Sequence, residues 1–311
     1  MLILLLASPA FGEDATVCLS GSGCTYTQAQ FEALSGNKAG STYTFSGTTN
    51  SSLNVDDIYG TSENNITLNG DAALIDMNSA NSSGLRITSS YITVDGFEIR
   101  EVGDDDAAVE LVGADHIKII NCNIHDNLNR AIFMKTNSTY ITIGEENNGN
   151  TLLNCGVDTG GMDIGIEGGS HIIIAHNHMY SDTATKGIDG IMTEGVSFLL
   201  IEYNSIRAHN RTGNAEDGID LKRDTHDVVI RYNHIYNNAR QSGVTVQSGS
   251  YDIWIYSNYI DGNDWAGLYV IEGYESTYGA PYNVWAWSNI ITGNEDSGIS
   301  VEDDCGNNVE T

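Results

Sequence analysis

A repeat runs along most of the chain and restricts its fold more than any other feature. Its core form is Gly-Ile-x-Val, a short polar turn, and then Ile-x-Ile-x-x-Asn-x-Ile-x-x-Asn. One copy has room for two or three short strands and their turns, but not for a helix. The first Asn of the aligned copies falls at Asn177, Asn204, Asn233, Asn258 and Asn289, with separations of 27, 29, 25 and 31 residues.

Apolar and polar residues alternate inside each predicted strand, so one side of the strand faces a core and the other faces solvent. A unit of this length cannot close a core by itself, but units stacked ~4.8 Å apart bury one continuous apolar column. We therefore predict an all-β chain whose residues 66–311 form a right-handed parallel β-helix, a solenoid that is a single elongated domain. The aligned Asn side chains should form a ladder of amides that hydrogen-bond along its axis.

Two segments precede the repeat. Residues 1–12 contain an apolar run followed by small residues, which is typical of the end of a secretory signal peptide. Residues 13–65 are expected to form an N-terminal cap with a short amphipathic helix within Thr27–Leu34. In an exported protein, Cys18 and Cys24 are expected to form a disulfide that closes a small loop.

The predicted location is therefore secreted, either extracellular or periplasmic. No later stretch approaches the ~18 apolar residues that span a membrane. The chain is expected to be a monomer or a module of a larger secreted protein, and the last repeat stops at Thr311 in mid-coil, which favours a fragment. Cys122 and Cys155 lie about one repeat apart and either pair or remain buried thiols.

The chain is strongly acidic, with 42 Asp and Glu against 13 Lys and Arg and a formal net charge of −29. This charge argues against binding to nucleic acid or to an anionic membrane, which require a basic surface. It also opposes direct binding of an anionic polymer unless a divalent cation bridges the two. An excess of carboxylates is equally compatible with a solubility or salt adaptation.

Stacked coils should align the outward residues of their first strands into columns. Acidic groups then converge over two adjacent coils, with Lys222 among them. Carboxylates held this close repel each other and need a cation, and Ca²⁺ takes six to eight oxygen ligands from such a set. The alternative is that the two Asp-Gly pairs at 189–190 and 217–218 are ordinary turns. The acidic residues are Asp189, Glu194, Glu216, Asp217 and Asp220.

Three such columns are predicted along the first strands of the coils. The first comprises Glu110, Phe133, Gly165, Met192, Asp220, Thr245, Tyr269 and Ser300, and the second Val112, Lys135, Glu167, Glu194, Lys222, Gln247, Ile271 and Glu302. The third, in the turn before the strand, comprises Asp189, Asp217, Ser242 and Ala266.

At these residues the sequence resembles the pectate-lyase-like superfamily of secreted β-helix proteins, over roughly residues 66–305. The more specific likeness is to the family-nine polysaccharide lyases, whose calcium site carries an Asp-Asp-Gly-Trp-Asp motif and an Asp from the preceding coil. In this chain Glu216-Asp217-Gly218-Ile219-Asp220 stands in that pattern, and Asp189 stands where the earlier Asp would. The resemblance implies that Asp189, Glu216, Asp217 and Asp220 bind Ca²⁺.

The resemblance is partial at the catalytic base. The family-nine lysine comes from the following coil, in an Asn-Gly-Phe-Lys context, but that coil in this chain reads Ser242-Gly243-Val244-Thr245. Lys222 lies on the metal-binding coil instead, closer to its placement in the alginate- and chondroitin-cleaving β-helix lyases. Those enzymes also use an arginine one coil on, where this chain has Gln247 with Arg240 nearby.

The predicted function is a calcium-dependent lyase that cleaves a uronic-acid polysaccharide, pectate- or alginate-like, by β-elimination. Lys222 is the predicted base. Arg223, Glu194, Arg240 and Tyr269 are the predicted substrate-binding residues. Tyr269 is expected to present its ring on an exposed strand, where aromatic faces suit sugar rings.

Two other functions remain open. A glycoside hydrolase on the same fold would use Asp189, Asp217 and Asp220, and a non-catalytic carbohydrate-binding or surface module would use none of these groups in chemistry. Asp224-Thr225-His226-Asp227 is similar to the Asp-Pro-His-Asp motif of β-helix mannuronan epimerases. We nevertheless expect His226 to be a turn residue that stacks with His171 and His116.

Overall fold

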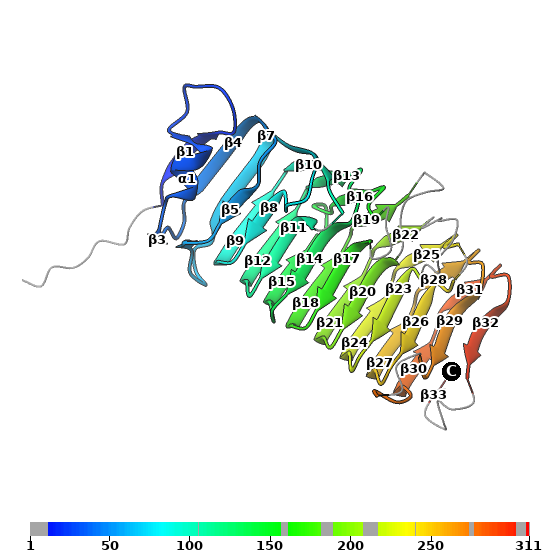
Figure 1. The fold of residues 1–311 in the computed structure, drawn as a ribbon. Helices are drawn as coiled ribbons and strands as arrows, with labels where there is room; N and C mark the ends of the chain where they lie inside the picture. Colours follow the sequence, from blue (N-terminus) through cyan, green and yellow to red (C-terminus); the bar gives the residue numbers. More distant parts are fainter. Residues whose placement is uncertain are drawn as a thin grey trace, which may run out of the picture.

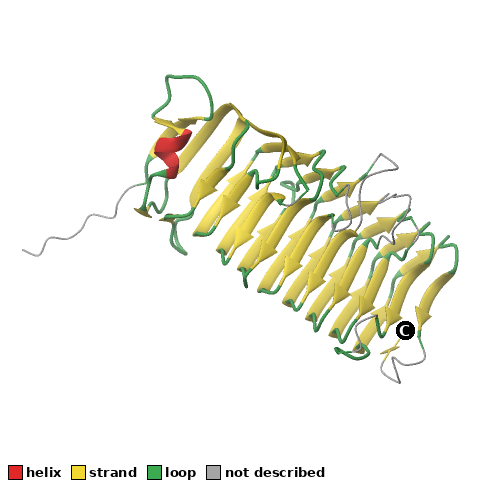
Figure 2. Cartoon of the chain, viewed as in Figure 1, coloured by secondary structure: helices red, strands yellow, loops and turns green. Residues whose placement is uncertain are grey.

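The computed structural model describes residues 12–104, 106–156, 161–181, 189–207, 217–239, 241–273, 277–302 and 309–310. Short strands stack coil upon coil into an elongated solenoid, with one short helix at the N-terminal end (Figures 1 and 2). The strand pairs that stack the coils are all parallel, which confirms the predicted parallel β-helix and its single elongated domain. No helix in the described segments is both long and apolar enough to span a membrane.

A ten-stranded parallel sheet forms one side of the solenoid and carries the candidate site. Each coil contributes one strand to it. In chain order the strands are β5 (Leu53–Val55), β8 (Leu85–Ile87), β11 (Ala107–Val112), β14 (Arg130–Lys135), β17 (Met162–Glu167), β20 (Asp189–Glu194), β23 (Ile219–Lys222), β26 (Val244–Gln247), β29 (Ala266–Ile271) and β32 (Ser297–Val301).

The remaining sides of the solenoid are formed by a 21-stranded sheet, to which each complete coil contributes its other two strands. One row comprises β9 (Ser90–Asp95), β12 (Asp115–Ile120), β15 (Thr139–Ile143), β18 (Ser170–Ala175), β21 (Ser197–Glu202), β24 (His226–Arg231), β27 (Tyr251–Tyr256) and β30 (Tyr282–Trp287). The other comprises β10 (Glu98–Val102), β13 (Asn123–His125), β16 (Thr151–Leu153), β19 (His178–Tyr180), β22 (Ser205–Arg207), β25 (His234–Tyr236), β28 (Tyr259–Asp261) and β31 (Ile290–Thr292). The sheet also includes β1 (Asp14–Cys18), β2 (Tyr26–Thr27), β4 (Thr42–Thr49), β7 (Ile66–Ala80) and β33 (Val309–Glu310), while β3 (Gly36–Asn37) pairs separately with β6 (Ile58–Tyr59).

The core is the stacked inward side of these strands. In the coil that contains β23, five apolar side chains are fully buried: Ile219, Leu221, Val228, Ile230 and Ile235. Each such side chain stabilises the fold by ~1.5–3 kcal/mol relative to an exposed position. The period-two pattern thus produces one uninterrupted apolar column. The alternate residues of each strand face outward, where they are available for binding or catalysis.

The predicted Asn ladder is confirmed at the turn before the short third strands. Each buried amide donates from Nδ2 to the Oδ1 of the Asn one coil further on, and the Asn233–Asn258 bond measures 3.0 Å. Asn233 Nδ2 also donates to the carbonyls of Ile201 and Arg231. The whole ladder runs through Asn150, Asn177, Asn204, Asn233, Asn258 and Asn289.

Replacing Asn233 with Ala should lower the free energy of unfolding by about 2–3 kcal/mol. The reason is that the variant leaves buried carbonyl and amide groups of two neighbouring coils without partners. Asn123→Ala, at an exposed position of β13, is the control and should change it by less than ~0.5 kcal/mol. Chemical denaturation of both variants measures this. Equal decreases in the free energy of unfolding would show that an Asn of the ladder stabilises the fold no more than an exposed Asn does.

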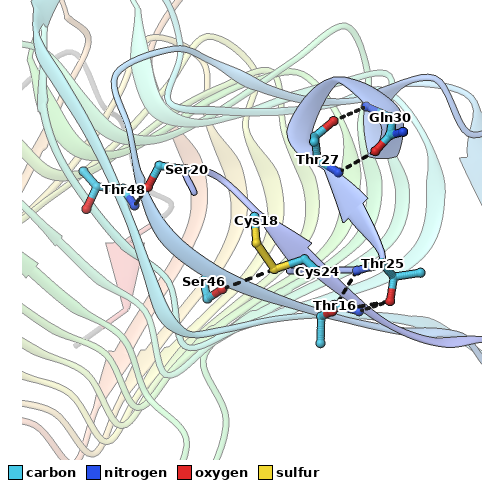
Figure 3. Close-up of a disulfide and its surroundings, with 9 residues drawn as sticks. All are labelled: Thr16, Cys18, Ser20, Cys24, Thr25, Thr27, Gln30, Ser46 and Thr48. Atoms are coloured by element: carbon cyan, nitrogen blue, oxygen red, sulfur yellow. Dashed lines mark hydrogen bonds between the residues drawn. A yellow bond between two sulfur atoms is a disulfide. The ribbon is translucent and has the colours of Figure 1, made fainter. Parts of the chain in front are cut away.

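The N-terminal end is closed by α1 (Gln28–Glu32), which forms within the predicted stretch. Thr27 and Gln30 form a capping box, and Phe31 packs its ring against Tyr43 and Phe45 at centroid distances of 5.1 and 5.0 Å. The predicted disulfide between Cys18 and Cys24 lies beside this helix (Figure 3).

Cys122 and Cys155 do not form a disulfide with each other. Both side chains are buried, and burial raises the pKa of the Cys122 thiol to about 12. They are therefore core residues, one of the two roles that the sequence left open.

One residue per coil adopts a left-handed conformation at the start of the longer strands. Five of these residues carry rings that stack along the solenoid at centroid distances of 4.4 to 4.8 Å. The rings belong to Tyr91, His116, Tyr140, His171 and Phe198, with φ between 54° and 58°.

The prediction that His226 stacks with His116 and His171 is wrong by one residue. His226 pairs in register with Ser197, and the left-handed position of its coil is Asp227. The His226 ring stacks instead on Tyr251, at 4.6 Å. Histidines aligned by residue type differ in register because the turns before them differ in length.

Candidate active site

The outward columns predicted for the ten-stranded sheet are present. The first is confirmed at every step, with Met192 paired to Asp220, Asp220 to Thr245 and Thr245 to Tyr269. The second brings Glu167, Glu194 and Lys222 side by side on β17, β20 and β23. The register therefore places the acidic residues and the lysine on one face.

Three carboxylates gather where β20 and β23 begin. Asp189 is the first residue of β20, Asp217 lies two residues before β23, and Asp220 is its second residue. All three are buried, at 7, 4 and 3% exposed. The backbone N–H of Asp217 donates to Asp189 Oδ1 at 3.0 Å, so adjacent coils are joined directly through the cluster.

Glycine follows Asp217 because the backbone there is packed against its neighbours. A Cβ at Gly218 would lie 2.5 Å from Ile235 Cγ2 and 2.6 Å from the carbonyl oxygen of Gly243. The Asp-Gly pair is therefore required by close packing rather than by a left-handed turn. This packing holds Asp217 at a fixed depth beside β23.

The next coil holds two of the carboxylates in place. Asp217 Oδ1 accepts from the backbone N–H of Ser242 at 3.0 Å and from Thr245 Oγ1 at 2.7 Å. Asp220 Oδ1 accepts from Gln247 Nε2 at 2.8 Å. Ser242, Thr245 and Gln247 were placed in the predicted columns, but the sequence analysis assigned them no part in the site. The only feature of the sequence that could have indicated this part is their position one coil after the acidic residues.

Lys222 forms an ion pair with the cluster, with its Nζ 3.0 Å from Asp220 Oδ2. Burial lowers the pKa of Lys222, but the negative charges of Asp220, Asp189 and Glu194 outweigh burial and leave that pKa raised. Lys222 is therefore held as an ammonium in this arrangement. Positive charge added beside Lys222 would lower this pKa.

The pKa values of Asp189 and Asp217 are both raised above that of an ordinary carboxyl group. Burial first, and then repulsion by Asp220, raise the pKa of Asp189 from 3.8 to about 7. Burial, with repulsion by Asp220 and Asp189, holds the pKa of Asp217 well above its usual range. Two carboxyls with raised pKa values on adjacent coils are typical of functional sites.

The raised pKa of Asp189 predicts a pH dependence. Between pH 4 and 7 the folded state binds a proton that the unfolded state releases, so the free energy of unfolding falls as pH rises through this window. Asp189→Asn cannot ionise and should lose this component, on the order of 2–4 kcal/mol, between pH 4 and 8. Thermal melts of both proteins in chelator check it, and parallel pH profiles would contradict it.

A groove of about 270 Å³ lies at the C-terminal ends of β17, β20 and β23, lined by Glu167, Glu194, Arg223 and Tyr278 among others. Glu194 and Arg223 form an ion pair across adjacent coils. Two of the four predicted substrate-binding residues, Glu194 and Arg223, thus meet at this groove. A larger groove, about 690 Å³, lies on the other sheet over Ile173, Leu200 and Val229. The lining of neither groove includes Asp189, Asp217 or Asp220.

The structure does not support a site role for the other predicted residues in the same way. Glu216 and Arg240 lie outside the described residues. Tyr269 occupies the predicted outward column but is only 7% exposed, so the expectation of an exposed ring is wrong. Its ring stacks against Trp265 at 5.2 Å and its hydroxyl donates to Glu302. The turn before β29 and the following coil cover it.

The described side chains include possible ligands for calcium. No three His, Cys, Asp or Glu side chains within the described segments are grouped closely enough to hold a metal ion as they stand. The donor chemistry nevertheless suits Ca²⁺, because Asp189, Asp217 and Asp220 are buried hard-oxygen donors whose mutual repulsion a cation would relieve. The Ser242 hydroxyl, which directly follows Asp217 in the turn column, is fully buried and has no hydrogen-bond partner among the described residues.

Known proteins that resemble this chain have the same fold. The family described as right handed beta helix region matches residues 107–279, which confirms the predicted hand of the solenoid. No curated protein matches the sequence.

Several solved structures have the same fold at low sequence identity. An alginate lyase from Paenibacillus sp. str. FPU-7 is 17% identical with a TM-score of 0.65, over 88% of this chain and 93% of that one. Pectate lyase Pel9A is 15% identical with a TM-score of 0.57, over 96% and 81%. The A-module of the Azotobacter vinelandii mannuronan C-5 epimerase AlgE4 is 16% identical with a TM-score of 0.63, over 95% and 82%.

Proposed function

This chain belongs to the right-handed β-helix family, and we propose that it is a secreted, calcium-dependent lyase of a uronic-acid polysaccharide. The observation that carries the proposal is the group of three buried carboxylates with Lys222 Nζ 3.0 Å from Asp220. The lyases and the epimerase of the same fold bear names that refer to pectate, alginate and mannuronan, which supports a polyuronate as the substrate class.

The negative charge of both the chain and the proposed substrate requires a cation between them. The chain carries a formal net charge of −29 and a polyuronate is also an anion, so direct contact is repulsive. Asp189, Asp217 and Asp220, with Glu216, would hold Ca²⁺. Calcium held there would supply positive charge that attracts the substrate carboxylate, acidifies the proton on the adjacent carbon and lowers the pKa of Lys222.

In the proposed reaction, neutral Lys222 removes the proton from the carbon α to the substrate carboxylate. The electron pair forms a double bond to the neighbouring carbon, whose glycosidic C–O bond breaks, and the leaving oxygen takes a proton from solvent. The products are a shortened chain and a fragment with an unsaturated, ultraviolet-absorbing end. Arg223, at the groove with Glu194, would bind a carboxylate of the adjacent sugar.

A glycoside hydrolase is the second candidate, because a carboxyl with a pKa of about 7, Asp189, suits a general acid. Incubation with pectate, alginate and glycosaminoglycans, with calcium or chelator, separates the two. Calcium-dependent ultraviolet absorbance supports the lyase, while new reducing ends without absorbance support the hydrolase. Binding without cleavage would make the chain a carbohydrate-binding module.

A further inference from the structure

The strand that follows the acidic cluster contacts two of its carboxylates directly. Thr245, on β26, is 3% exposed and donates to Asp217 Oδ1 at 2.7 Å. Gln247, two residues later on the same strand, donates to Asp220 Oδ1 at 2.8 Å. Both side chains point outward, because the residue between them, Val246, is fully buried in the core.

These bonds divide the oxygens of Asp220 between two partners. Gln247 holds Oδ1, while Lys222 lies 3.0 Å from Oδ2. For Asp217, Oδ1 takes both Thr245 and the Ser242 backbone. The coil of β26 therefore fixes the rotation of each carboxylate and so determines which oxygen faces the rest of the cluster.

We propose that Thr245 and Gln247 are positioning residues that orient Asp217 and Asp220 for a divalent cation. The inference rests on the proposed function, because it assumes that the cluster binds calcium. It extends that function by giving a role to the coil of β26, which lacks the lysine that the family-nine lyases have there. Hydrogen-bond partners of metal-binding carboxylates usually set metal affinity, and their loss costs ~10–100-fold.

Thr245→Val keeps the shape of the side chain and removes the donor, while Thr245→Ser keeps the donor. Gln247→Leu removes the second donor at a partly exposed position. Thr142→Val, on β15 of the other sheet, is the matched control for a threonine outside the site. Thermal melts in chelator show which variants are folded before any metal is added.

Calcium titration by calorimetry, with terbium luminescence as a second probe, measures the effect. We expect Thr245→Val and Gln247→Leu each to weaken calcium binding by at least ~10-fold. Thr245→Ser and Thr142→Val should stay within ~3-fold of the unchanged chain. Equal affinity in all variants would overturn the positioning role while leaving the calcium site intact. If the unchanged chain binds neither ion, the proposed calcium dependence fails and the positioning role fails with it.

Discussion

Lys222→Ala is expected to lower kcat for polyuronate cleavage by about 10³-fold. Removal of a general base that acts in the transition state typically costs 10²–10⁴-fold. The loss should fall on kcat more than on KM, because in the proposed mechanism substrate is bound by the cation and Arg223. The measurement is the initial rate of ultraviolet absorbance with saturating polymer and calcium.

Lys222 also neutralises buried carboxylates, so its loss destabilises the apo chain, and stability needs its own control. Lys222→Gln retains a hydrogen-bond donor toward Asp220 and should be equally inactive, with circular dichroism to confirm the fold. Lys118→Ala removes a lysine that pairs with Glu145 on the other sheet and should keep full activity. Full activity of Lys222→Ala would assign the base to another residue.

Asp220→Asn is expected to weaken calcium binding on the order of 10²-fold, because affinity follows the number of charged ligands. The amide keeps an oxygen to accept from Gln247, so the hydrogen bond of 2.8 Å can survive while the charge is lost. Calorimetric titration checks it. Asp252→Asn, on β27 of the other sheet, is the control and should bind calcium normally. Unchanged affinity in Asp220→Asn would move any calcium site elsewhere.

The fold and the columns were predictable because a parallel solenoid has a simple rule. Residues one repeat apart lie side by side, so the alternation around Ile219 and Leu221 determines which residues face outward. The pairing of Met192, Asp220 and Thr245 follows from that alternation alone. The Asn ladder follows as well, since Asn recurs at one position of successive coils.

What the sequence could not predict depends on contacts made by turns and side chains. Tyr269 was expected to be exposed, but Trp265, from the turn before its strand, lies over its ring. His226 differs from His171 by one residue in register because the intervening turns vary in length. The bonds of Thr245 and Gln247 to the acids depend on side-chain rotamers, which an outward position leaves undetermined.

The most direct test of the proposed function is the release of unsaturated ends by the unchanged chain. The substrates are polygalacturonate and alginate, and the absorbance is followed first in calcium, then after chelation, then after calcium is restored. The proposal predicts a rise with one of these polymers that stops on chelation and resumes with calcium but not with an equal concentration of magnesium. Cleavage that yields only saturated ends, or absorbance that continues in chelator, would contradict it.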